Sequence, residues 1–488
     1  MNFNKKLGIV SFTFQLLWGQ VVYGDLDKVQ LNRTVESLIQ QRVPRASVAI
    51  ALLDTATGQV VYERRADELF QPASTAKLFS ATAALLELGT KYRFATVVKS
   101  EPQLDKKKAF VNNLYLSFSG DPSLSIEEFK QLILAIKTAG ITQIKGDIIV
   151  EQSQFQAPNY ALGWCWDSLA WYYAAPVTSV ILNENRVAIT LDSKKLGEQV
   201  QVALAKEESV MIPIQSNVLS VTESAANSEC QIQVNMNEKN ELNLSGCWPT
   251  NPGPMTVKVA VKNPFAYMQK VLLDVLQAEN IQLLGKVRVG DVPKEAEIIA
   301  THFSEPLEGL LKKVLQDSNN LYADSLLKTL GVVRFQNGTF QAGIRAVAEI
   351  LAKPTGINFA GLRLMDGSGL STYNLLTPKQ LSQLLMTIHQ SEILKQPLMD
   401  ALPVWGMEGT LRSRKPIDFA RGSIRAKTGT FLGARALSGF LTTQQQKDYV
   451  FVVMTDHFLE PKNEMREFED ELCHLFLNMI GQEKEEKK

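Results

Sequence analysis

The sequence changes character twice, near residues 93 and 262, and this change most constrains how the chain can fold. The stretch between them has short strand-like runs such as AFVNNLYLSFSG, many Asn, Ser and Gln residues, and few helical patterns. A chain of 488 residues also exceeds the length at which one hydrophobic core stops growing. We therefore predict a main domain made of residues 25–92 and 263–488, split by mostly β domains at 93–262. We detect no internal repeat.

The main domain is expected to be of the α/β (α+β) class, with an antiparallel sheet flanked by helices. From Ser47, the runs SVAIALLD and QVVYERRA are separated by the turn TATG and predict a hairpin. Residues 75–88 are rich in Ala and Leu and predict a buried helix that ends at Gly89. Near the C-terminus, SIRAKTGT, ARALSGFLTT and DYVFVVMTD predict three antiparallel strands, followed by an amphipathic helix after Pro461.

The first residues resemble an export signal. Asn4-Lys5-Lys6 gives a positive start, residues 7–18 form an apolar stretch, and Val22-Tyr23-Gly24 is a plausible cleavage site. We expect residues 1–24 to be a signal peptide and the mature protein to be periplasmic. The alternative is an uncleaved anchor, but this stretch is short for a span that needs about 20 apolar residues. No transmembrane segment is expected in the mature chain.

Composition excludes several classes of function. With 51 basic and 51 acidic residues, the chain has no net charge and no general attraction to nucleic acid. The chain has four histidines, and it lacks a Cys-x-x-Cys pair and a His-Glu-x-x-His motif, so no metal and no cofactor are expected.

The four cysteines are predicted to behave differently. Cys230 and Cys247 flank two short alternating segments, residues 231–234 and 241–244, which resemble paired strands and would bring the two sulfurs together. We predict a disulfide between them. Cys165 and Cys473 lie far from this hairpin, and we interpret both as buried thiols.

Ser74-Thr75-Ala76-Lys77 is the first candidate catalytic motif. On a helix, positions three apart share a face, so the amine of Lys77 would reach the hydroxyl of Ser74. A neutral lysine can then take the serine proton and create a nucleophile without histidine. The pattern alone is weak, because Ser325 and Lys328 repeat it. We favour Ser74 because it stands at a helix start, where backbone N–H groups stabilise developing negative charge.

Two further motifs follow. Ser318-Asn319-Asn320 can present its first and third side chains together in a turn, although a polar turn between helices is the alternative interpretation. Lys427-Thr428-Gly429-Thr430 lies on a predicted strand, where a cation and a hydroxyl can hold a substrate carboxylate. There Gly429 would let the substrate backbone approach as an added strand. The alternative is an exposed strand end with a glycine bulge.

The three motifs occur in the order helix start, turn between helices, strand. This order is that of penicillin-binding proteins and serine β-lactamases. The chain resembles the class C low-molecular-mass penicillin-binding proteins, the D-alanyl-D-alanine carboxypeptidase/endopeptidase family. The resemblance extends over nearly the whole mature chain and includes the separation of Lys77 from Ser318 and the segments 120–124, 163–167, 174–176 and 366–371. It implies a penicillin-binding/β-lactamase-like transpeptidase domain split by a two-domain insert.

The resemblance also implies roles in acylation. Ser74 attacks the D-alanyl carbonyl and Lys77 is its general base. Lys427 keeps the Lys77 amine neutral by repulsion and desolvation, although which lysine takes the proton is disputed among related enzymes. The backbone N–H groups of Ser74 and Thr430 hold the oxyanion.

For the leaving group, the resemblance implies that Ser318, held by Asn320 and Lys77, passes the proton to the departing D-alanine. Thr428 and Lys427 bind the terminal carboxylate. The expected partners are peptidoglycan peptide stems, with β-lactam antibiotics as covalent inhibitors.

Residues 163–167 carry the most specific indication of substrate. By resemblance, Trp164 and Tyr172 wall a pocket in which Asp167 receives the free amine of a diaminopimelyl side chain. The alternative is that the tryptophans only anchor the insert against the main domain.

Two other functions are compatible with the sequence. A β-lactamase shares the acylation residues but needs a deacylating base, and Glu184 is the only carboxylate we can nominate. A catalytically silent wall-binding scaffold would have no need of an intact Ser74, Lys77, Ser318 and Lys427 set. The balance between carboxypeptidase and endopeptidase action is open, because both present a D-alanyl carbonyl to the same serine.

Overall fold

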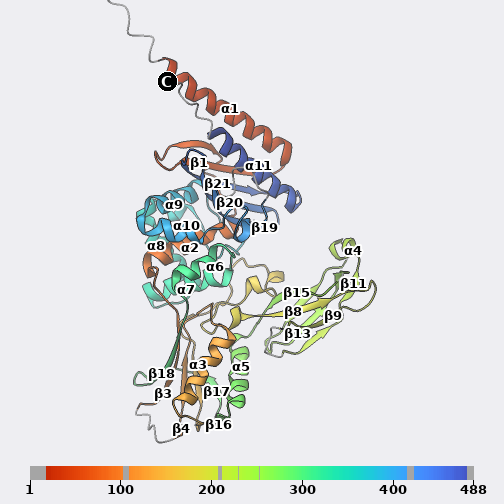
Figure 1. Ribbon diagram of the computed structural model, residues 1–488, viewed down its shortest axis with the longest axis vertical. Coiled ribbons are helices and arrows are strands. Elements are labelled where there is room, and N and C mark those ends of the chain that lie inside the picture. Colours follow the sequence, from red (N-terminus) through yellow and green to blue (C-terminus); the bar gives the residue numbers. More distant parts are fainter. Residues whose placement is uncertain are drawn as a thin grey trace, which may run out of the picture.

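The computed structural model describes residues 18–102, 109–206, 212–228, 230–251, 253–414 and 422–480 (Figure 1). The fold mixes helices with antiparallel sheets, which confirms the predicted class. Within the described residues, every helix is too short or too polar to span a bilayer.

A five-stranded antiparallel sheet joins the two ends of the chain. Its strand order is β19-β20-β21-β1-β2, and the central pair aligns Ser47 with Asp456. The predicted N-terminal hairpin and the three predicted C-terminal strands are confirmed. The strands are β1 (Ser47–Asp54), β2 (Val60–Arg64), β19 (Ile424–Phe431), β20 (Ala434–Thr442) and β21 (Asp448–Asp456).

Helices cover both faces of this sheet (Figure 1). On one face lie α1 (Trp18–Arg42) and α11 (Lys462–Ile480), which share a core with the sheet. The expected cleavage site lies within α1, and the buried residues of this helix that the structure describes all follow it: Leu31, Val35 and Ile39. Residues 1–17 lie outside the described residues.

The other face carries the helical core that supports the motifs. Its central helix, α2 (Lys77–Leu88), is buried from Lys77 to Leu85, which confirms the prediction of an apolar helix. It packs against several helices of the C-terminal half. These helices are α6 (Leu307–Leu315), α7 (Asn320–Phe335), α8 (Phe340–Thr355), α9 (Pro378–Gln390) and α10 (Glu392–Ala401).

The first part of the insert is a second five-stranded sheet of order β17-β7-β5-β3-β18. A small sheet and two helices pack with it around a separate core. Its elements are β3 (Ala95–Ser100), β4 (Phe110–Val111), β5 (Leu114–Ser117), α3 (Ile126–Thr138), β6 (Gln143–Ile144), β7 (Ile148–Glu151), α5 (Pro264–Ala278), β16 (Gln282–Leu283), β17 (Val287–Val289) and β18 (Glu297–Phe303).

This sheet corrects the predicted boundary at residue 262. Residues 264–303 pair with the insert rather than with the main domain, since β18 lies antiparallel to β3 with Phe303 opposite Ala95. The chain enters and leaves at adjacent points, where Ser304 accepts a hydrogen bond from the backbone N–H of Phe94 at 2.9 Å. We propose that the insert runs from residue 94 to residue 304. The pairing is non-local, so local composition did not reveal it.

The insert contains an internal repeat that the sequence analysis missed. The unit α3-β6-β7 recurs as α5-β16-β17, and corresponding strands pair in parallel, Gln143 with Gln282 and Ile148 with Val287. The sequences TQIKGDIIV and IQLLGKVRV align without a gap and share a glutamine, the glycine between the two strands and the last valine. This similarity is short, and the pairing of the strands makes the repeat clear.

The second part of the insert consists of small sheets. The hairpin expected around residues 231–244 is present, with Gln233 opposite Ser245. The elements are β8 (Arg186–Asp192), β9 (Gln201–Leu204), β10 (Ile214–Ser216), β11 (Leu219–Val221), α4 (Glu223–Ser228), β12 (Gln233–Met236), β13 (Leu242–Ser245), β14 (Cys247–Pro249) and β15 (Met255–Ala260).

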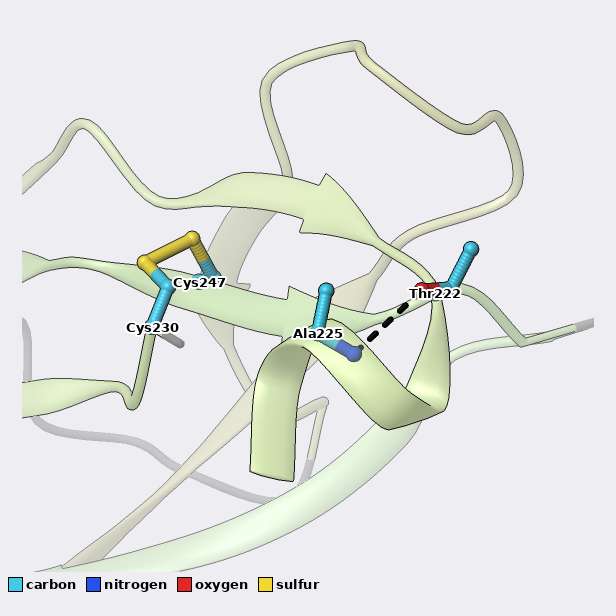
Figure 2. Close-up of a disulfide and its surroundings, with 4 residues drawn as sticks. All are labelled: Thr222, Ala225, Cys230 and Cys247. Carbon is cyan, nitrogen blue, oxygen red and sulfur yellow. Dashed lines mark hydrogen bonds between the residues drawn. A yellow bond between two sulfur atoms is a disulfide. The ribbon is translucent and has the colours of Figure 1, made fainter. Parts of the chain in front are cut away.

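Cys230 and Cys247 form a disulfide beside this hairpin (Figure 2). It links the segment that follows the short helix α4, whose first turn is capped by Thr222, to strand β14. Cys473 is buried as expected, but the expectation for Cys165 is wrong, because its thiol is exposed. The reason is that Cys165 lies on a loop over a cleft rather than in a core.

A buried ionic cluster fixes α11 to the sheet. Glu469 accepts two hydrogen bonds from Arg435, at 2.9 and 2.8 Å, and one from Arg414 at 2.6 Å. The side chains of Glu469 and Arg414 are each 2% exposed, so their charges depend on one another.

We expect Glu469→Ala to lower the free energy of unfolding by about 3–5 kcal/mol, because it leaves two buried guanidinium groups without their shared carboxylate. Urea unfolding of the purified protein measures this change. The control is Glu464→Ala, an exposed position of the same helix, for which a change within about 0.5 kcal/mol is expected. Equal effects of the two substitutions would contradict the dependence on the cluster.

Candidate active site

Ser74 lies on a strained turn directly before α2. The short 3₁₀ helix Ala73–Ala76 holds it, and Ala73 has a left-handed backbone with φ of 43°. Non-glycine residues rarely adopt this conformation, and such strain is typical of functional sites. Two glycines permit close packing around the turn: a Cβ on Gly369 would lie 1.9 Å from the carbonyl oxygen of Ala73, and one on Gly429 2.6 Å from that of Pro72.

This contact changes the role expected for Gly429. From the sequence, its missing side chain was expected to make room for the substrate. In the structure, the missing Cβ instead lets strand β19 approach the backbone around Ser74, since a Cβ there would stand 3.1 Å from the Ser74 nitrogen.

The amine of Lys77 joins three distant segments. Its Nζ donates hydrogen bonds to the Oγ of Ser74 at 2.9 Å, the Oδ1 of Asn320 at 2.6 Å and the carbonyl oxygen of Ser368 at 2.6 Å. Burial lowers the pKa of Lys77 to about 8, although the carboxylates of Asp324 and Asp366 act in the opposite direction. A substantial fraction of Lys77 is therefore neutral near pH 8 and can accept a proton.

Ser318 and Lys427 form a second hydrogen-bonded pair. The Nζ of Lys427 donates to the Oγ of Ser318 at 2.8 Å and to the carbonyl oxygen of Thr428 at 2.9 Å. Ser318 was expected to be held by Asn320 and Lys77, but its partner in the structure is Lys427. Its own φ of 58° is left-handed, so this turn is strained as well.

The charge of Lys77 and a backbone carbonyl of the insert both act on the groups around Lys427 and Asn320. Burial and the nearby charge of Lys77 lower the pKa of Lys427 well below its ordinary value. Asn320 accepts from Lys77 and donates through Nδ2 to the carbonyl oxygen of Tyr173 at 2.7 Å. A backbone group of the insert thus helps to orient a side chain beside the two lysines.

The open edge of β19 passes beside Ser74. β19 is the outermost strand of its sheet, and its edge at Ile424 and Ala426 bonds to the segment 403–405. Because every second residue presents its N–H and C=O to the same side, Thr428 and Thr430 present theirs to this edge as well. The N–H of Thr430 therefore faces the same side as the Ser74 turn, and these two N–H groups are the candidates to bind an oxyanion. The Oγ1 of Thr428 donates a hydrogen bond to Thr410 at 2.9 Å.

Two buried aspartates to which the sequence assigned no role support Lys77; one of them, Asp366, begins the segment 366–371 of the family resemblance. Asp324 accepts from the backbone N–H groups of Gly367 at 2.7 Å and Ser368 at 3.0 Å, which fixes the carbonyl that binds Lys77. Asp366 accepts from the backbone N–H of Ser371 at 2.6 Å. The available signal was the position of Asp324, four residues after Asn320 and so on the same face of α7.

These groups open into a cleft of about 610 Å³. It brings together the main domain and the insert. Its lining includes Ser74, Ser318, Asn320 and Thr430, together with Cys165, Ser168 and Tyr173 from the insert.

The residues predicted to bind substrate beyond the motifs lie differently from the expectation. The Nε1 of Trp164 donates to Asp366 at 2.8 Å, and its ring packs against Tyr160 and Phe340. This corrects its assignment to a pocket wall, because its indole anchors the insert to the active-site loop.

Asp167 and Tyr172 lie next to the cleft-lining residues. Asp167 is exposed on a 3₁₀ turn, Trp166–Ser168, between Cys165 and Ser168. Tyr172 is also exposed, and its neighbour Tyr173 lines the cleft in its place. Sequence reasoning could not separate these adjacent tyrosines.

The second Ser-x-x-Lys match has a structural role. Lys328 is buried in α7 and donates to the carbonyl oxygens of Gln156, Pro158 and Val177, each at 3.0 Å. It ties the insert to the main domain, and Ser325 is not its partner.

Glu184, nominated as a deacylating base, is engaged elsewhere. It accepts from Asn319 at 2.8 Å and lies 3.6 Å from Arg186.

Comparison with known proteins agrees with this geometry. The model of the D-Ala-D-Ala carboxypeptidase 3 (S13) family matches residues 31–475. The chain belongs to this family. As an S13 family member, it is a serine peptidase. It is 30% identical over 425 residues to the D-alanyl-D-alanine carboxypeptidase DacB of Haemophilus influenzae, covering 86% of this chain and 88% of that protein.

Other relatives extend the family assignment. The chain is 29% identical over 427 residues to the D-alanyl-D-alanine carboxypeptidase of Actinomadura sp. (strain R39), covering 84% of this chain and 78% of the relative. Its structure is similar to the crystal structure of penicillin binding protein 4 from Haemophilus influenzae, with a TM-score of 0.83 and 28% identity over 91% of this chain and 99% of the other. A second structure of that protein is complexed with a β-lactam, and its TM-score is 0.77 at 27% identity, over 91% of this chain and 99% of that one.

We expect Asp324→Asn to move the acidic limb of the acylation rate to lower pH, by about one unit. Burial raises the pKa of Asp324 itself to about 8. Where Asp324 is ionised, its carboxylate raises the pKa of Lys77, so its loss keeps the amine neutral at lower pH, while Asn retains an oxygen for the loop. The measurement is the second-order rate constant of penicillin acylation from about pH 5 to about pH 10, a range that spans the pKa of Lys77. An unmoved or raised limb would show that Asp324 does not act on Lys77, and Asp274→Asn, on the remote insert, is the matched control.

Proposed function

We propose that this chain is a serine-type D-alanyl-D-alanine carboxypeptidase and DD-endopeptidase, which cleaves peptidoglycan peptides through an acyl-enzyme. One observation carries the proposal: in a member of the S13 family, the Ser74 hydroxyl lies 2.9 Å from a buried lysine whose pKa is lowered to about 8. That arrangement suits a nucleophile and its base.

Acylation begins when Lys77 takes the proton of Ser74. The Ser74 oxygen attacks the D-alanyl carbonyl carbon, and the resulting oxyanion accepts hydrogen bonds from the N–H groups of Ser74 and Thr430. The substrate lies as an added strand along the edge of β19. The left-handed turn at Ala73 presents the hydroxyl to this edge.

Departure of the leaving group uses the other pair. The hydroxyl of Ser318 protonates the departing amine as the C–N bond breaks, and Lys427, 2.8 Å away, replaces that proton. The substrate carboxylate, held by Thr428 and Lys427, favours the charged form of this lysine. The proton that Lys77 took from Ser74 passes to Lys427, which has become neutral, and Lys77 is a free base again. Water then attacks the ester of Ser74, and Lys77 takes the proton of this water and returns it to the departing Ser74 oxygen.

The same serine is proposed to react with β-lactams and to hold them as a long-lived adduct. A relative of known structure is complexed with a β-lactam. Glu184 accepts a hydrogen bond from Asn319 and pairs with Arg186, so it is a poor base for water attacking the ester. This arrangement favours the peptidase over a β-lactamase.

We place the mature protein in the periplasm. Three features support this location: the signal-like N-terminal sequence, the disulfide between Cys230 and Cys247, which favours an oxidising compartment, and a substrate found outside the cytoplasm.

Asp167 is proposed to receive the free amine of the diaminopimelyl side chain. It is an exposed carboxylate between two residues that line the cleft, Cys165 and Ser168. An ammonium group at the cleft entrance would therefore meet a negative charge.

The central test is D-alanine release from a diaminopimelate-containing pentapeptide. We expect Ser74→Ala to reduce kcat by at least about 10³-fold, because the nucleophile is lost. Ser325→Ala, in the second Ser-x-x-Lys match, is expected to retain activity. Penicillin should leave a stable adduct on the wild type and none on Ser74→Ala. Rapid loss of the label from the wild type would instead support a β-lactamase.

A second test concerns Asp167. We expect Asp167→Ala to raise KM about fivefold for the diaminopimelate peptide, the size of an exposed charge pair. A substrate with the free amine acetylated is the control, because it has no positive charge to lose. If both substrates respond equally, Asp167 does not recognise the amine.

A further inference from the structure

A second cavity adjoins the catalytic groove. It is open and has a volume of about 810 Å³, and residues from the ends of α6 and α10 and from strand β19 line it. Two residues of its lining connect it to the active site. Asp317 directly precedes Ser318 in the chain, and Thr410 accepts a hydrogen bond from the Oγ1 of Thr428. The cavity therefore begins where the carboxyl end of a bound substrate is proposed to lie.

The backbone closes the edge of β19 at this point. The backbone N–H of Ala426 donates to the carbonyl oxygen of Pro403 at 3.1 Å, and that of Trp405 donates to Ile424 at 3.0 Å. A peptide paired with Thr428 and Thr430 cannot continue along the same edge. A leaving group longer than one residue must turn aside, and the cavity beside Thr410 provides the space.

The acidic groups of the cavity already have partners. Asp317 pairs with Lys313 at 3.0 Å, and both carboxylate oxygens of Asp400 accept from Gln396 at 2.8 Å. Glu408 accepts from Gln316 at 3.1 Å. A cation neutralises only Asp317, whereas Asp400 and Glu408 bond to neutral amides and keep their negative charge.

The cationic groups are available. Lys312 and Arg412 are exposed, and neither forms a hydrogen bond or ion pair within the part of the chain that the structure describes. Among the described residues, the side chain of Arg425 has one hydrogen-bond partner, the carbonyl oxygen of Met399, to which its Nη1 donates at 3.0 Å. These three cations exceed the two charged carboxylates, Asp400 and Glu408, so the cavity keeps a net positive charge that suits a ligand carboxylate.

We propose that this cavity is the leaving-group subsite for the second stem peptide of a cross-link, whose carboxylates bind Lys312, Arg412 and Arg425. The inference rests on the proposed function. In a cross-linked dimer, the departing amine belongs to a whole stem peptide, which extends past Thr428 into the cavity. When the departing group is a single D-alanine, it ends at Thr428 and does not reach these cations. The cavity thus favours endopeptidase action.

The experiment compares two substrates in the full-length protein: a D-alanyl-diaminopimelyl cross-linked muropeptide dimer, and a monomeric pentapeptide. The variant is Lys312→Glu/Arg412→Glu. The matched control is Arg45→Glu/Lys353→Glu, which makes the same charge change at two exposed positions away from the cavity. All rates are normalised to the fraction of enzyme that penicillin labels, so that unfolded protein does not count.

We measure kcat/KM for dimer cleavage and for D-alanine release and take the ratio of the two. In the cavity variant, this ratio is expected to fall by roughly tenfold or more, because two charge contacts are lost. In the control, it is expected to stay at the wild-type value. For the wild type, the same ratio is expected to fall as salt is raised. An unchanged ratio in the cavity variant would overturn the subsite, as would a wild type that cleaves pentapeptide but no dimer. If the wild type neither releases D-alanine nor binds penicillin, the proposed function itself is wrong.

Discussion

The buried amine of Lys77 is the group on which the rest of the active site depends. Its side chain is fully buried, so each of its protons needs an acceptor, and the chain supplies one from each of three segments: Ser74, Asn320 and Ser368. Burial also lowers its pKa, which makes it a base near neutral pH. One physical condition, desolvation of an amine, therefore holds the site together and gives it its chemistry.

The insert takes part in this arrangement rather than lying apart from it. The carbonyl oxygen of Tyr173 orients Asn320, and the indole of Trp164 bonds to Asp366 on the loop that supports Lys77. Lys328 binds three carbonyl oxygens of the insert. The insert is therefore positioned by buried polar contacts, which are directional and fix its orientation over the cleft.

Sequence reasoning succeeded where the signal was local and failed where it depended on pairing. Ser74 and Lys77 share one turn of helix, and their distance follows from their spacing. The insert boundary was misplaced because strand β18 finds its partner β3 about two hundred positions earlier, as their residue numbers show. Amino-acid composition predicts neither the pairing of β18 with β3 nor the exposure of the Cys165 thiol.

The sequence by itself determined which side chains are proposed to carry the chemistry, the order of the elements that present them, and the apolar character of the helix behind the proposed nucleophile. Only the tertiary structure decided that Ser318 is held by Lys427, that Gly429 makes room for the Ser74 turn, and that Asp324 supports the loop under Lys77. The physical reason is that residue type and spacing fix what a side chain can donate or accept. Which partner it meets is fixed by backbone contacts between segments that are distant in the chain.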